Sequence, residues 1–153
     1  MSEYLFQNFE MTRNLFFREL TGVTEEMADV QPEGFNNTIH WHVGHVLTAT
    51  EGFMFGFPTK SQNLPANYKE LFGNGTKPGD WTEAVPSMEE LLVQLKEQVG
   101  RLKEIPAASF EQKLQNPFLG LETFGQLANM ALYHESHHMG QIHVMKRIIQ
   151  QGK

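Results

Sequence analysis

The sequence predicts an all-α protein, a four-helix bundle, and three observations lead to that prediction. Four long segments carry apolar residues at helical spacing, two of them open with a capping box, and no segment shows the alternation of a strand. Four amphipathic helices bury their apolar stripes most simply against one another. The length of 153 residues is that of one ordinary domain, so we expect residues 1–153 to form a single bundle.

The first two helices are expected over residues 3 to 20 and residues 38 to 55. The first has a stripe of period close to 3.6, formed by Leu5, Phe9, Phe16 and Leu20. Between the two helices, the chain has the Pro, Gly and Asn content of a loop. This loop ends at a candidate helix cap, either Asn36 or Asn37.

The last two helices each begin with a capping box, in which a Ser or Thr and a Glu or Gln three residues later satisfy free backbone N–H groups. Ser87 and Glu90 form the first box, and Thr123 and Gln126 form the second. The link from residue 57 to residue 86 is rich in Pro and Gly and offers one or two helical turns. It is long enough to cross the bundle's full length, which predicts that helices two and three are parallel.

Composition excludes several classes of function. The net charge is −6 and the few basic residues are scattered, so no nucleic-acid partner is expected. No apolar segment approaches the roughly 20 residues that cross a bilayer, and no signal peptide is evident, which predicts a cytoplasmic protein with no membrane partner. The chain has no Cys, so a metal would be held by His, Asp, Glu or carbonyl oxygen.

Two histidines of the last helix fall on positions that the apolar stripe reserves for the core. His134 and His138 are four residues apart, so both rings lie on one helix face and can reach one cation. Buried imidazoles without partners would cost about 1 to 3 kcal/mol each. The pair therefore predicts a shared metal, with histidines hydrogen-bonded to other helices as the alternative.

A third ligand is expected from helix two, whose segment TIHWHVGHVL contains His40, His42 and His45. Periodicity leaves both His42 and His45 beside the apolar stripe and does not choose between them. Three imidazoles with a fourth position left open are typical of a catalytic rather than a structural site. Such a ligand set suits Zn, Ni or Fe(II) about equally.

Residues 134 to 138 also read H-E-x-x-H, the helix signature of zinc metalloproteases. Those enzymes take a third ligand downstream, and here no Glu or Asp follows His138. Glu135 points about 100° away from His134 on a helix. We therefore expect no proteolysis, and we expect Glu135 to lie at the surface or to support the site from behind.

Several neighbours of these histidines have more than one interpretation. His137 is a spare ligand, a base that supports the site or a surface residue, and we place it at the rim of a pocket. Gln141 either orients a ligand or is a polar spacer. Trp41 belongs to the core or walls an apolar substrate pocket. Gly44 and Gly140, both inside helices, suggest close helix packing.

The motif TIHWHVGHVL on helix two, together with H-E-x-H-H-M-G-Q-I on helix four, resembles the DinB-like family, which includes the YfiT-type and bacillithiol S-transferase proteins. The resemblance covers nearly the whole chain. It implies that His45, His134 and His138 are the metal ligands. From their positions in the sequence, Trp41, His42, His137 and Gln141 are expected to line the substrate pocket or to support the ligands. The resemblance also implies an up-down-down-up bundle, a homodimer, and bound Zn or Ni, with Fe possible.

Some members of that family transfer a low-molecular-weight thiol to a small electrophile. The resemblance thus implies a metal-dependent thiol S-transferase whose metal lowers the pKa of the bound thiol. Because the chain has no Cys, the thiol would be a cosubstrate. The alternatives are a metal-dependent hydrolase and a non-catalytic metal-binding bundle of the stress response.

Overall fold

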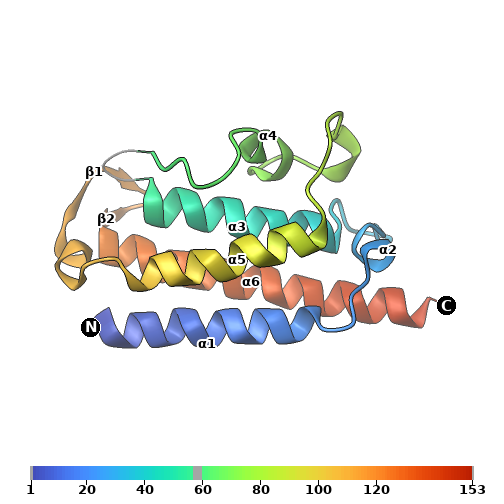
Figure 1. Cartoon of the computed structure of the whole chain (residues 1–153), viewed down its shortest axis with the longest axis horizontal. Helices are drawn as coiled ribbons and strands as arrows, with labels where there is room; N and C mark the ends of the chain where they lie inside the picture. Colours follow the sequence, from blue (N-terminus) through green and yellow to red (C-terminus); the bar gives the residue numbers. More distant parts are fainter. Residues whose placement is uncertain (1, 57–59, 153) are drawn as a thin grey trace.

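A computed structural model describes residues 2–56 and 60–152, and most of that chain is helical (Figure 1). Four long helices lie side by side: α1 (Ser2–Leu20), α3 (Ile39–Phe55), α5 (Met88–Lys103) and α6 (Phe124–Gln151). Figure 1 shows α1 and α6 running in one direction and α3 and α5 in the other. The predicted all-α class is confirmed for the main body.

The connections between the long helices carry short helical elements. The loop after α1 contains α2 (Glu25–Ala28), which we had expected to be irregular. The expected crossover includes residues 57–59, which lie outside the described part. Its later portion forms α4 (Tyr68–Phe72), as predicted, and the 3₁₀ turn η1 (Pro78–Asp80). Another 3₁₀ turn, η2 (Ala107–Glu111), follows α5.

The expectation of no strands is wrong. β1 (Lys113–Phe118) and β2 (Leu121–Thr123) form an antiparallel hairpin immediately before α6. Most side chains of β1 are exposed, and only Leu114 is half-buried. A strand that faces solvent on both sides does not show the apolar and polar alternation on which sequence prediction depends.

The helix starts follow from local chemistry. Both predicted capping boxes are present, at Ser87 before α5 and at Thr123 before α6. The cap of α3 is Thr38 and not Asn36 or Asn37, because the Thr38 hydroxyl accepts a hydrogen bond from the backbone N–H of Trp41 at 3.1 Å. This cap fixes the start of the helix that carries the histidine motif.

The core is divided into two apolar clusters along the bundle. One lies around Phe16, Leu47, Phe72 and Leu91, and the other around Phe9, Leu102, Phe110 and Leu127. The helices α3 and α6, which carry the histidines, share the most extensive contact of any two elements in the bundle. Among the described residues, no helix is both long and apolar enough to cross a membrane.

Two helical glycines are expected to respond to substitution in opposite ways. A Cβ on Gly44 would overlap the Phe72 ring, so this glycine permits close packing, as predicted. No other atom of the described residues lies within 4 Å of a Cβ on Gly140, so close packing was the wrong interpretation there. Gly44→Ala should lower the free energy of unfolding by about 1 to 3 kcal/mol, and Gly140→Ala should raise it by about 0.5 to 1 kcal/mol. Urea denaturation measures both; a Gly44→Ala protein as stable as the parent would contradict the packing.

Candidate metal centre

Three histidines from two helices bring one ring nitrogen each to a common point. Nε2 of His134 lies 3.1 Å from Nε2 of His45 and 3.1 Å from Nε2 of His138. A tetrahedral centre with ligand bonds of 2.0 to 2.1 Å has nitrogens about 3.3 Å apart. The three side chains therefore stand close to the spacing that one metal ion requires, and they form a group that could hold one.

In two of these histidines, the ring nitrogen that faces away from the common point has a hydrogen-bond partner. Nδ1 of His45 lies 2.6 Å from the backbone oxygen of Phe72, and because a carbonyl only accepts, Nδ1 carries the proton. Nδ1 of His138 lies 2.8 Å from Nδ1 of His42. This pattern, in which the nitrogen facing away from the centre is hydrogen-bonded, fixes the tautomer and the orientation of metal-binding histidines.

The third histidine provides the test of whether a cation fits the group. Nδ1 of His134 is buried and has no hydrogen-bond partner within residues 2–56 and 60–152, so other helices satisfy at most one of its two ring nitrogens. With all three rings neutral and protonated at Nδ1, the Nε2 lone pair of His134 would face those of His45 and His138 at 3.1 Å and be repelled by both. One proton could bridge only two of the three nitrogens, whereas one divalent cation would accept a lone pair from each. The donor set fits a divalent metal.

The surroundings keep these imidazoles neutral. Burial, with smaller contributions from His45 and His137, lowers the pKa of His134 to about 4. Burial also lowers the pKa of His138, and His45 and His134 add to the effect. For His45, burial lowers the pKa although the Phe72 carbonyl opposes it. Neutral imidazole is the form that ligates metal, so at pH 7 the group is ready to bind.

Aromatic rings enclose the histidine group on two sides. The Trp41 indole stacks on the His45 ring at a centroid distance of 4.5 Å and an interplanar angle of 11°. Its Nε1 donates to the Thr76 hydroxyl at 2.9 Å, which fixes the indole against the crossover. The Phe53 ring meets the His134 ring edge-on at 5.7 Å. His45 and His138 are buried and His134 is half-buried, so His134 is the most exposed member of the group.

Glu135 belongs to a buried ion pair and not to the surface, which corrects one of the two interpretations offered for it. Both carboxylate oxygens accept from Arg13 of α1, at 2.6 and 2.9 Å. The exposed fractions of Arg13 and Glu135 are 1% and 0%. Arg13 also donates to the backbone oxygen of Leu95 and to the side chain of Gln98. A carboxylate held in this way cannot serve as the general base of a metalloprotease.

Comparison with known proteins identifies the family. The sequence model of the DinB superfamily matches residues 8–142. The chain belongs to the DinB superfamily. A crystal structure described as the conserved protein of locus from Enterococcus faecalis has the same fold, with a TM-score of 0.72 and 15% identity over 100% of this chain and 98% of that one. No curated protein matches.

Of the three histidines on α3 of this DinB-superfamily chain, the structure brings two to the group. His45 joins it directly, and His42 contacts it through His138. Burial, then the charges of His45 and His137, lower the pKa of His42 to about 4. His40 faces away: its Nδ1 lies 2.7 Å from Asp29 and its Nε2 lies 2.8 Å from the Pro86 oxygen.

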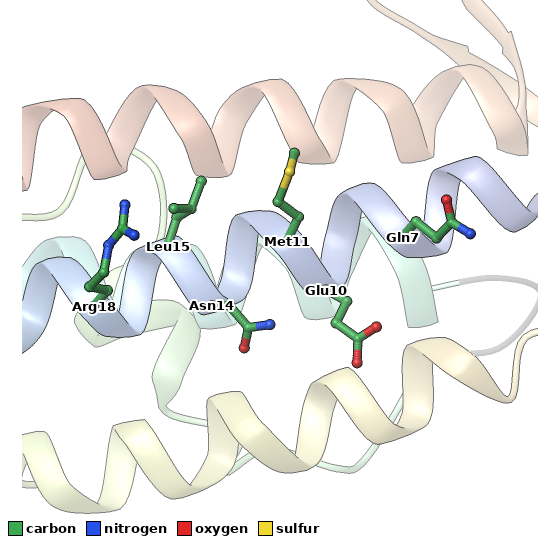
Figure 2. A pocket seen from close by; sticks show the side chains of 6 residues that line it. All are labelled: Gln7, Glu10, Met11, Asn14, Leu15 and Arg18. Carbon is green, nitrogen blue, oxygen red and sulfur yellow. The ribbon is translucent and has the colours of Figure 1, made fainter.

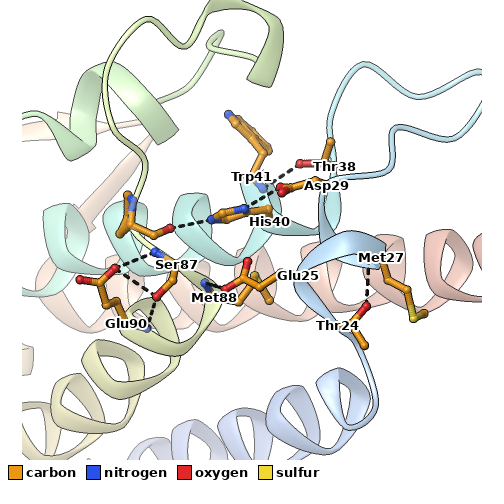
Figure 3. Close-up of polar contacts among 11 residues, drawn as sticks. Thr24, Glu25, Met27, Asp29, Thr38, His40, Trp41, Ser87, Met88 and Glu90 are labelled. Carbon is orange, nitrogen blue, oxygen red and sulfur yellow. Dashed lines mark hydrogen bonds and ion pairs between the residues drawn. The ribbon is translucent and has the colours of Figure 1, made fainter.

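His40 forms part of a separate polar cluster at the start of α5 (Figure 3). Its ligand-type atoms lie near those of Glu25 and Asp29, both exposed. Glu25 accepts the backbone N–H of Met88 at 2.7 Å, so this carboxylate caps α5. The cluster joins α2 and α3 to the start of α5.

His137 and Gln141 lie on the outer face of α6. Their Nε2 atoms are 2.8 Å apart, and both side chains line a shallow surface groove with Phe35 and Val144. His137 packs against the ring of His138, so it borders the histidine group on the solvent side. His143 is exposed.

A second surface groove lies along α1 and is far simpler in its chemistry (Figure 2). It is lined by Gln7, Glu10, Met11, Asn14, Leu15 and Arg18. Figure 2 shows Met11 and Leu15 pointing toward α6 and Glu10 pointing away from it. All six residues come from one helix, and none is a histidine. The candidate centre is therefore the histidine group.

The depressed histidine pKa values predict how the metal-free protein responds to acid. Between pH 6.5 and about 4, the unfolded chain binds protons at His42 and His134 that the folded chain does not. Stability rises with pH wherever the unfolded state binds more protons, so the free energy of unfolding should fall as the pH is lowered through this window. Urea denaturation at several pH values measures it. His134→Phe should show a shallower fall; an unchanged slope would contradict the assignment.

Proposed function

We propose that the chain is a metal-dependent enzyme that transfers a low-molecular-weight thiol to a small electrophile. One divalent metal, Zn or Ni with Fe possible, is held by His45, His134 and His138. The observation that carries this proposal is that Nε2 of His134 lies 3.1 Å from Nε2 of both His45 and His138, while Nδ1 of His134 has no partner in the described chain. Three imidazole ligands leave a fourth position for an exchangeable group.

The chain's own residues prepare that position. The Phe72 carbonyl and His42 hold the rings of His45 and His138 so that their Nε2 atoms face the centre. Trp41 covers His45 and shields that side from water. When bound, the metal supplies the positive charge that lowers the pKa of a thiol, so that the nucleophilic thiolate exists at neutral pH. The sulfur comes from a cosubstrate, because the chain has no Cys.

The position of Glu135 argues against the peptidase mechanism of the H-E-x-x-H signature. A metalloprotease of that type would use this carboxylate beside the centre to activate water. The carboxylate adjacent in sequence is engaged with Arg13 through both oxygens. A thiol, whose ordinary pKa near 8.5 is far closer to neutrality than that of water, needs no such base once its pKa is lowered.

His137 and Gln141 form the solvent-side rim of the proposed site. Their hydrogen bond and the contact of His137 with His138 support this placement.

Residues 1–153 act as one cytoplasmic domain with up-down-down-up order, supported by the helix directions in Figure 1. The partners are a small-molecule substrate and a second copy of the chain; the exposed Tyr133, Val144 and Ile148 on α6 offer an apolar face for the latter.

Cobalt substitution tests the proposal. Loading the protein with Co(II) and adding bacillithiol, mycothiol, glutathione or coenzyme A should produce a sulfur-to-metal charge-transfer band with one of them. Turnover of a model electrophile should then require both metal and that thiol. If the metal binds but no thiol gives a band or turnover, thiol transfer is excluded, and a hydrolase or a non-catalytic metal-binding bundle remains.

A further inference from the structure

The tip of the β1–β2 hairpin carries a side chain that neither local conformation nor solvation favours. Leu119 and Gly120 both have positive φ, at 50° and 79°, and they connect Phe118 to Leu121, which face each other across the ladder. A two-residue turn of this kind favours Asn, Asp or Gly at its first position. Leu at positive φ is strained, because its Cβ crowds the backbone.

Leu119 gains nothing from burial that would offset this strain. Its exposed fraction is 81%, the largest among the exposed large apolar residues of the described chain. An Asn at this position would relieve the turn and would suit water better. Strain that a sequence tolerates at an exposed apolar residue points to a role outside the fold itself.

The same hairpin tip is connected to the histidine group by a chain of aromatic contacts. Phe118, next to Leu119, is 41% exposed, and its ring lies 5.8 Å from the ring of Phe53. Phe53 in turn meets His134 edge-on at 5.7 Å. His134 is the half-buried member of the group, so these rings flank its most exposed histidine.

We infer that Phe53, Phe118 and Leu119 form an apolar wall that selects an electrophile with an aliphatic or aromatic body. The inference rests on the proposed function. The histidines supply the polar groups of the site, whereas Phe53, Phe118 and Leu119 offer only apolar surface to a substrate. An electrophile whose reacting atom lies beside the metal-bound sulfur would lay its apolar part against Phe53 and the hairpin tip. Leu119 gives up water contact when that substrate binds, which accounts for its presence at the turn.

The test uses metal-binding probes whose tails grow by one methylene at a time. Co(II)-loaded protein is titrated with n-alkyl hydroxamates, from acetohydroxamate to octanohydroxamate, and with the corresponding n-alkanethiols. A methylene buried against the wall should tighten binding by about fourfold, from about 0.8 kcal/mol per methylene. Leu119→Asn and Phe118→Ser should cut the gain to below about twofold per methylene, while acetohydroxamate affinity stays unchanged. Val93→Ser, at an exposed apolar residue of α5, is the matched control and should behave as the parent.

The possible results of this titration test the apolar wall and the proposed thiol transfer independently of each other. An equal dependence on chain length in the parent and both hairpin variants overturns the wall, whatever the thiols do. A chain-length dependence with hydroxamates that the hairpin variants lose, combined with no charge-transfer band from any thiol, supports the wall and overturns thiol transfer. A protein that takes up no Co(II) overturns both. Leu119→Asn should also be at least as stable as the parent, so loss of tail binding cannot be ascribed to unfolding.

Discussion

Replacing any one of His45, His134 and His138 by Ala should remove nearly all metal from the purified protein. In the proposed site each ring supplies one of three protein ligands, so its loss should weaken binding by more than the 10- to 100-fold that follows from removing a supporting residue. The measurement is elemental analysis of protein produced with each metal and without a histidine tag. Circular dichroism should show that the helices remain.

Two other histidines serve as controls for this result. His42→Ala removes the partner of His138 Nδ1 and should weaken binding by about 10- to 100-fold without abolishing it. His143→Ala, at an exposed ring that pairs with Glu19, should leave the metal content unchanged. A metal content lost in His42→Ala and kept in His45→Ala would show that the ligand from α3 has been misassigned.

Arg13→Met should destabilise the fold by about 3 to 5 kcal/mol, the largest effect expected of a substitution outside the histidine group. Glu135 would remain buried with an uncompensated charge, and the Gln98 side chain and the Leu95 carbonyl would lose a donor. Chemical denaturation measures the free energy of unfolding. Arg18→Met, at an exposed position of the same helix, is the matched control and should change stability by less than about 0.5 kcal/mol.

The double variant Arg13→Met, Glu135→Leu distinguishes a charge effect from a packing effect. Apolar groups of similar volume often replace a buried ion pair at little cost, so the double variant should recover most of the lost stability. A loss in Arg13→Met below about 1 kcal/mol would contradict the account of the ion pair. A double variant less stable than Arg13→Met would show that the stability lost in Arg13→Met does not come from the uncompensated charge of Glu135.

The helices were predictable because their evidence is local. Apolar spacing and two capping boxes lie within single segments, and the structure has both boxes at Ser87 and Thr123. The hairpin was missed because its strands are short and mostly exposed. Thr38 was passed over as the cap of α3 in favour of the asparagines before it, although Thr is an acceptable N-cap residue.

The inward pair of His134 and His138 also followed from periodicity, whereas the contribution of α3 did not. The choice between His42 and His45 depends on how α3 is rotated against α6, which is set by tertiary packing such as the fit of Gly44 against Phe72. The Arg13 and Glu135 pair joins residues 122 positions apart. One local signal was available: Arg13 falls between Phe9 and Phe16 on the core face of α1, where a charge requires a buried partner.

The central claim is that three imidazoles hold one divalent metal and leave a position open for a thiol. X-ray absorption at the metal edge, on protein purified without a histidine tag, tests it most directly. The account predicts one metal per chain, with three nitrogen ligands at about 2.0 to 2.1 Å, and a new sulfur ligand at about 2.3 Å once the thiol is added. A spectrum without imidazole scattering, or a closed four-ligand shell that no thiol enters, would contradict it.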